Sequence, residues 1–153
     1  MFSIQNNLKD VKENLCQWLN SLYYTQGQWD WYLTLTFRDE VRLGRAERLW
    51  RRFCHQVRSD GRDISYFKAT EWHKFRRVPH FHAIMGNVSD LRRLTFMDKW
   101  YSMAGIARIK PYQHNKGVHY YLSKYITKEN SGYADWDIEL LPKNTLQNNI
   151  NFS

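Results

Sequence analysis

Residues 64–85, ISYFKATEWHKFRRVPHFHAIM, decide the fold of this chain. Segments 64–73 and 78–85 are rich in β-branched and aromatic residues, which favour strands. The connection between them, residues 74–77, is short enough for a hairpin, and Gly86-Asn87 ends the second segment. The sequence therefore predicts two antiparallel strands joined by a basic turn.

The hydrophobic periodicity predicts helices and strands on both sides of this hairpin. In chain order they are helix 6–24, strand 31–37 and helix 43–57, then, after the hairpin, helix 91–101, strand 106–109 and helix 115–128. The central order β-α-β-β-α-β is the ferredoxin-like, or RRM-like, pattern. We therefore expect an α+β fold whose central antiparallel sheet has helices on one face and leaves the other face for the active site.

The length of 153 residues suits one domain. We expect an N-terminal amphipathic helix packed on the domain within residues 1–29, the functional domain over 30–128, and an acidic, Asn-rich tail over 129–153. The sequence contains no run of 18 apolar residues and no apolar leader, so we expect no membrane span and a cytoplasmic location.

Charge and aromatic content suit a nucleic-acid partner. The chain has 23 Lys and Arg residues against 15 Asp and Glu, a net charge of +8, and 16% of its residues are aromatic. Cations hold phosphates, and aromatic rings stack on bases. Charge alone leaves open a basic protein without such a partner. The pattern GxxxxGK[ST] is absent, which excludes a P-loop ATPase or helicase within this sequence.

The second strand of the hairpin carries paired histidines. Side chains alternate along a strand, so His80 and His82 share one face, while Phe81 and the apolar residues that follow it point to the other. Antiparallel pairing brings Glu71 opposite the two histidines. Two imidazoles and a carboxylate with open positions suit Mg²⁺ or Mn²⁺ holding a substrate phosphate. The alternative is a pair of surface histidines beside an ordinary exposed carboxylate; His73, at the turn, is a further candidate ligand.

The last predicted helix carries two tyrosines one turn apart. Tyr121 and Tyr125 lie about 40° apart on one face, flanked by Lys124 and Lys128. A phenol is a poor nucleophile at neutral pH and needs a polarised phosphate and nearby positive charge to attack. The alternative is that both rings are core aromatics. Since Tyr125 lies nearer the apolar stripe, we expect Tyr121 to be freer and to attack first, with Tyr125 as the second nucleophile.

The basic turn is the candidate DNA contact. It combines rings for stacking with cations for phosphates. Its residues are Trp72, His73, Lys74, Phe75, Arg76 and Arg77. The alternative is an ordinary basic hairpin turn.

Three patterns occur in a fixed order: Thr34-Leu35-Thr36-Phe37, then His80-Phe81-His82 with Glu71 upstream, then the segment 121–128, YLSKYITK. Together they resemble the HUH endonucleases, specifically rolling-circle replication initiators. The paired tyrosines resemble the two-tyrosine initiators of small single-stranded DNA phages. The residues Gly105 to Ile109, leading into Gly117-Val118, are also similar to that group.

This resemblance implies a nicking domain over 30–128 with His80, His82 and Glu71 as ligands of Mg²⁺ or Mn²⁺. It implies a site-specific single-stranded DNA endonuclease and strand-transferase that forms a 5′-phosphotyrosine at a phage or plasmid origin. A helicase and a polymerase would act in trans, in the cytoplasm of the host cell. Lys124 or Lys128 would offset charge on the phosphate or phenolate. Two alternatives remain: a transposase with the same chemistry, and a non-enzymatic RRM-like binding module.

Overall fold

A five-stranded sheet organises the computed structural model, which describes residues 4–73, 75, 78–126 and 135–142. The strands lie in the order β4-β1-β3-β2-β5, and every neighbouring pair is antiparallel. Their bounds are β1 Trp29–Leu35, β2 Ser65–Trp72, β3 Pro79–Gly86, β4 Ala107–Pro111 and β5 Trp136–Glu139. The α+β class and the antiparallel sheet are as predicted, and the order of the first four strands is that of the ferredoxin-like pattern.

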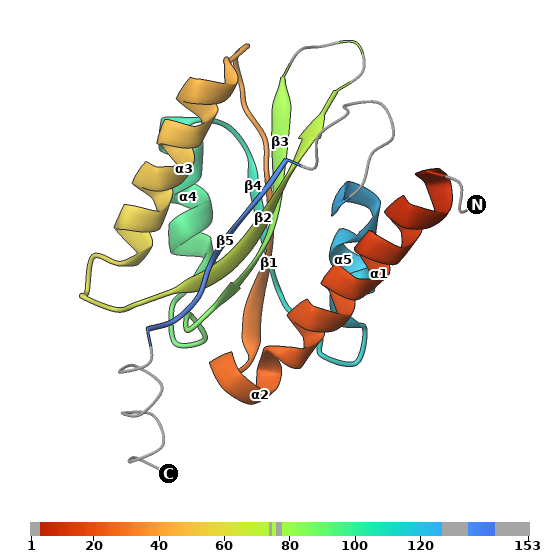
Figure 1. Ribbon diagram of the computed structural model, residues 1–153. Helices are drawn as coiled ribbons and strands as arrows, with labels where there is room; N and C mark the ends of the chain where they lie inside the picture. Colours follow the sequence, from red (N-terminus) through yellow and green to blue (C-terminus); the bar gives the residue numbers. More distant parts are fainter. Residues whose placement is uncertain (1–3, 74, 76–77, 127–134, 143–153) are drawn as a thin grey trace.

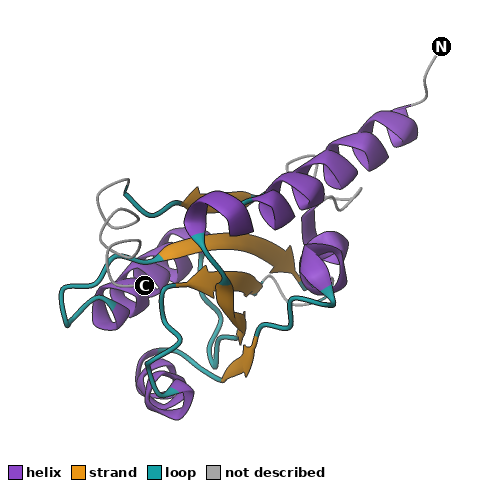
Figure 2. Cartoon of the chain, turned by 90° about the horizontal axis from the view of Figure 1, so that it is seen from below, coloured by secondary structure: helices purple, strands orange, loops and turns teal. Residues whose placement is uncertain are grey.

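Helices cover both faces of this sheet (Figure 1). Their bounds are α1 Ile4–Ser21, α2 Tyr23–Gln26, α3 Leu43–Val57, α4 Arg93–Met103 and α5 Gly117–Ile126. The two crossover helices, α3 and α4, pack together on one face as expected, over Phe81, Ala83 and Met85 of β3. Figure 2 shows α1 running along the molecule and projecting beyond it toward the N-terminus. Within the described residues, no helix is both long enough and apolar enough to cross a membrane.

The face predicted to be free of helices is partly covered, and this corrects the expectation. Apolar stripes on α1 and α5 bury each other and the sheet in a second core. This core includes Cys16 and Leu19 from α1, Leu122 from α5, and Phe67 and Ile84 from the sheet. The site therefore lies at the border of a second hydrophobic core, because burial of both stripes stabilises the fold more than a bare sheet face would.

The strand β5 is a second difference from the sequence analysis, which predicted only a tail after residue 129. It pairs with β2, with Ala69 opposite Trp136 and Phe67 opposite Ile138. The Trp136 ring stacks on Phe67 with 5.5 Å between centroids. Four residues are too few for a clear period in the sequence, and their place is set by the open edge of β2.

The predicted hairpin forms in the predicted register. Glu71 pairs with His80, and Ala69 pairs with His82. On its other side, β3 pairs with β1, where Thr34 lies opposite His82. Directly opposed residues of antiparallel strands point to the same face. The register therefore places Glu71, His80, His82 and Thr34 on the face that α1 and α5 partly cover.

Candidate active site

His82 is the centre of the site. Its side chain is buried, with only 5% of its surface exposed. Its Nδ1 lies 3.3 Å from the hydroxyl oxygen of Tyr32, and its Nε2 lies 3.9 Å from Oε1 of Glu71. The Tyr125 ring stacks flat on the imidazole, with 3.6 Å between centroids and an interplanar angle of 3°. Three separate elements, β1, β2 and α5, thus fix this one ring.

The Tyr32 contact bears on the tautomer of His82. When Nδ1–H donates to the Tyr32 oxygen, the lone pair of the neutral ring is on Nε2, the nitrogen nearer to Glu71. Metal-binding histidines commonly have such a partner on the second nitrogen. Sequence reasoning missed Tyr32. Its signal was present, because Tyr32 has the same strand parity as Thr34, which pairs with His82.

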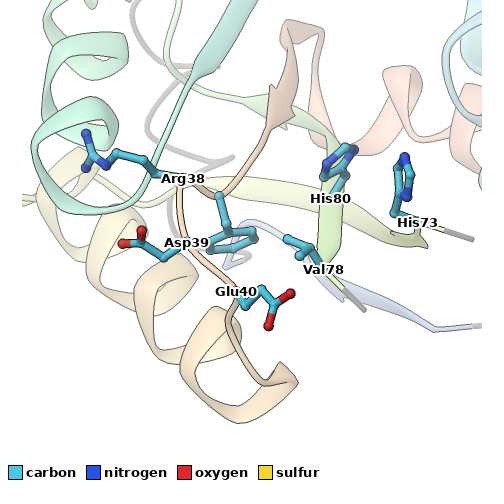
Figure 3. A pocket seen from close by; sticks show the side chains of 7 residues that line it. Arg38, Asp39, Glu40, His73, Val78 and His80 are labelled. Carbon is cyan, nitrogen blue, oxygen red and sulfur yellow. The ribbon is translucent and has the colours of Figure 1, made fainter. Parts of the chain in front are cut away.

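His80 lies next along the same face and is half-buried. Its ring centroid is 6.4 Å from that of His73. Both imidazoles line a 290 Å³ pocket with Asp39 and Glu40, and Figure 3 shows the two rings side by side, facing the loop that follows β1. His80 therefore lies between the His82 site and an acidic loop.

The donor set at this face suits a divalent cation. Oxygen and nitrogen ligands lie about 2 Å from Mg²⁺ or Mn²⁺, so two ligands of one ion are about 3–4 Å apart. The 3.9 Å between His82 Nε2 and Glu71 Oε1 is within that range. Among the residues that the structure describes, no three His, Cys, Asp or Glu side chains form a ready-made metal cluster. The geometry thus supports the pair His82 and Glu71 more directly than it supports His80.

The two tyrosines of α5 have opposite environments from those expected. Tyr121 is only 8% exposed, and its hydroxyl accepts a hydrogen bond of 2.9 Å from the backbone N–H of Gln113. Its ring packs on those of Tyr32 and Tyr112, at 4.7 and 4.8 Å. Tyr125 is half-buried and lies over His82. The prediction that Tyr121 is the freer side chain is wrong, because rings from β1 and the β4–α5 connection enclose it.

The electrostatics at Tyr125 oppose loss of its proton. Burial, with the negative potential of Tyr32 and Glu71, raises the pKa of Tyr125 to about 12. Burial likewise raises the pKa of Tyr32. The phenol of Tyr125 is therefore protonated at neutral pH, and attack requires added positive charge. Lys124 is exposed, and its Nζ lies 5.4 Å from the centre of the Tyr125 ring.

A basic groove adjoins the tyrosines, and sequence reasoning missed most of it. One hollow of 290 Å³ is lined by Thr34, Thr36, Arg108 and Lys110, and a second of 500 Å³ by Lys110, Lys116, Lys124, Tyr121 and Tyr125; Tyr32 lines both. Arg108 and Lys110 are exposed, while Ala107 and Ile109 are buried. This alternation was readable in the sequence as two cations on one strand face.

The predicted DNA contacts of the hairpin are only partly described. Lys74, Arg76 and Arg77 lie outside the described residues, as does Lys128 of the tyrosine segment. Phe75 and His73 are exposed. Trp72 pairs with Pro79, so strand alternation directs it to the face opposite Glu71, the face on which α3 and α4 pack. Trp72 is therefore not beside the histidines, which corrects its predicted place.

A family comparison agrees with this arrangement. The sequence model of the family described as replication-associated protein, ORF2 type, matches residues 30–130, more than half of the chain. The chain belongs to this family. Its role is therefore in DNA replication, with DNA as its partner. No curated protein and no solved structure matches the chain.

Proposed function

We propose that this protein nicks and rejoins single-stranded DNA at the replication origin of a phage or plasmid, through a covalent bond between Tyr125 and a 5′ phosphate. The observation that carries the proposal is the stack of Tyr125 on His82. It holds a potential nucleophile directly against the histidine that Glu71 approaches. Two requirements of a nicking site, a nucleophile and a phosphate-binding group, would thus share one position on the sheet.

The proposed step balances without water or a nucleotide cofactor. The Tyr125 oxygen attacks phosphorus, the bond from phosphorus to the 3′ oxygen breaks, and a phosphotyrosine bond forms. The phenol loses one proton, and the leaving 3′ oxygen gains one. The phosphoester bond is retained, so the reverse attack by a 3′ hydroxyl rejoins the strand. Tyr121 lies one turn away and is the candidate for a second transfer, which would have to open its hydrogen bond to Gln113.

We further propose that His82, Glu71 and His80 hold Mg²⁺ or Mn²⁺, with His80 included on the strength of strand parity. A bound ion of this kind polarises the scissile phosphate. Tyr32 would keep the His82 ring in the orientation that the ion needs. Lys124 would stabilise the charge that develops on the phosphate or the phenol.

The test uses a pool of random single-stranded oligonucleotides, incubated with the protein and Mn²⁺ and separated in SDS after boiling. A 5′-phosphotyrosine retains the downstream fragment, so 3′-labelled DNA must label the protein and 5′-labelled DNA must not. We expect no labelled protein with Tyr125→Phe or with EDTA. Binding without any adduct in the wild type would make the protein a non-enzymatic module. Family membership favours replication over transposition.

A separate measurement tests the metal proposal without relying on cleavage. Mn²⁺ binding to the DNA-free protein is followed by electron paramagnetic resonance for wild type, His82→Ala and Glu71→Ala. We expect one tight site in the wild type that is lost or strongly weakened in each variant. Equal Mn²⁺ binding in all three proteins would remove these side chains from the proposed ligand set.

A further inference from the structure

A second hollow, separate from the tyrosine site, opens where α1, α2 and the start of α5 meet. It has a volume of 490 Å³, and its wall includes Tyr23, Tyr24, His114 and Lys116. We propose that this hollow, the aromatic pocket, binds an unpaired nucleobase of the DNA strand that occupies the tyrosine site. The inference rests on the proposed function for its ligand, single-stranded DNA.

The rings of this pocket face solvent to a degree that core packing does not explain. Tyr24 is 86% exposed and Tyr23 is 48% exposed. Their rings meet edge to face at 5.4 Å, and Tyr23 meets His114 in the same way at 5.0 Å. An exposed, pre-arranged group of rings provides flat surfaces on which bases of any sequence can stack.

Polar groups of the pocket match the rest of a nucleotide. Lys116 provides a cation for a phosphate, and the amides of Gln28 and Asn115 line the wall, where they can pair with the edges of a base. Asn20 lies at the floor, with its Oδ1 accepting the backbone N–H of Val118 at 3.0 Å. This bond ties α1 to the start of α5, so the pocket and the tyrosine helix are fixed relative to each other.

A continuous series of rings joins the aromatic pocket to the tyrosine site. From Tyr121 the contacts run to Tyr112 at 4.8 Å, from Tyr112 to His114 at 5.3 Å, and from His114 to Tyr23 at 5.0 Å. Tyr23 is therefore no more than about 15 Å from Tyr121, a distance that roughly four stacked nucleotides span. Lys116 lines both hollows, so one strand can pass from one to the other along a single cation.

The experiment measures the affinity of the full chain for thymidine oligonucleotides of increasing length, by fluorescence anisotropy in EDTA so that no cleavage occurs. We expect Tyr24→Ala to bind long oligonucleotides about tenfold more weakly than wild type, because a base loses its stacking partner. Tyr24→Phe retains the ring and should bind as wild type does. The loss should vanish for oligonucleotides too short to reach both hollows.

Tyr101→Ala is the matched control, because Tyr101 is also an accessible tyrosine, 59% exposed, on α4 across the sheet. It should leave affinity unchanged at every length. Equal affinity of Tyr24→Ala and wild type for all lengths would overturn the pocket, as would a loss that is the same at every length. The labelled-adduct experiment is independent of this result: adduct formation with no length-dependent effect of Tyr24 refutes the pocket and leaves the nicking proposal in place.

Discussion

The two faces of β3 share one backbone and have opposite surroundings. Toward α3 and α4, the residues Phe81, Ala83 and Met85 are fully buried in an apolar core. Toward α1 and α5, burial decreases along the strand: Ile84 is fully buried, His82 is 5% exposed, and His80 is half-buried. The site thus forms where the second core ends, and Tyr125 is the last described ring that covers it.

This difference separates what stabilises the protein from what it does. Side chains on the α3 and α4 face should affect unfolding, since each lies in close-packed apolar surroundings. Side chains on the other face near the end of β3 should affect metal binding and cleavage. Substitutions at adjacent positions of the same strand should therefore fall into two classes, and the predictions that follow test that separation.

The largest effect is expected at the site face. His82→Ala should lower the rate of cleavage on the order of a thousandfold, as when a group that stabilises developing charge is removed. Single-turnover cleavage of a labelled oligonucleotide measures this, and single-strand affinity should change little because the basic surface remains. Ala83→Ser, at the next position on the opposite face, is the control and should cleave at the wild-type rate per folded molecule. Cleavage by His82→Ala within about tenfold of wild type would remove His82 from the mechanism.

One position earlier, Phe81→Ala should act on stability instead. Phe81 is fully buried and its ring contacts those of Phe37 and Trp50. Loss of the ring leaves a cavity, and we expect the free energy of unfolding to fall by about 3–5 kcal/mol. Urea denaturation followed by tryptophan fluorescence measures this change. A fall of less than about 1 kcal/mol would show that this face is less tightly packed than its burial indicates.

A smaller effect is expected when only a hydroxyl that orients His82 is removed. Tyr32→Phe retains the ring that packs on Tyr121 and deletes the oxygen 3.3 Å from Nδ1. The affinity of the DNA-free protein for Mn²⁺ should fall about tenfold or more, the usual effect of losing such a partner. Tyr66→Phe is the control, since Tyr66 packs toward α3 and hydrogen-bonds Asp137. Similar Mn²⁺ affinities of Tyr32→Phe and wild type would assign Tyr32 to packing alone.

The smallest effect concerns the basic groove. Arg108→Ala and Lys110→Ala should each weaken single-strand binding modestly and reduce the slope of log affinity against log salt by about one, because each removes one phosphate contact. Arg51→Ala on α3 removes an exposed arginine on the opposite side of the sheet and should leave the slope unchanged. If all three variants had equal slopes, DNA would not follow the groove beside β4.

The local features of the site were predictable from the sequence, and its surroundings were not. Strand alternation and a short turn fix the parity of His80 and His82 and the register of Glu71. The burial of Tyr121 depends on Tyr32 and Tyr112, which are distant from it or on other elements. The angle of about 100° per residue orders side chains around α5 but does not say which neighbours enclose each one. The packing of α1 on the site face has the same long-range origin.

The identity of the residue that carries the DNA tests the central claim most directly. Trypsin cuts after Lys116, Lys124 and Lys128, so Tyr125 falls in a different peptide from Tyr120 and Tyr121. The adduct with 3′-labelled DNA is digested with trypsin and nuclease, and the peptide with the residual nucleotide is sequenced by mass spectrometry. We predict that the first adduct formed is on Tyr125. A first adduct on Tyr121, or on any residue other than Tyr125, would contradict the account of a nucleophile held against His82.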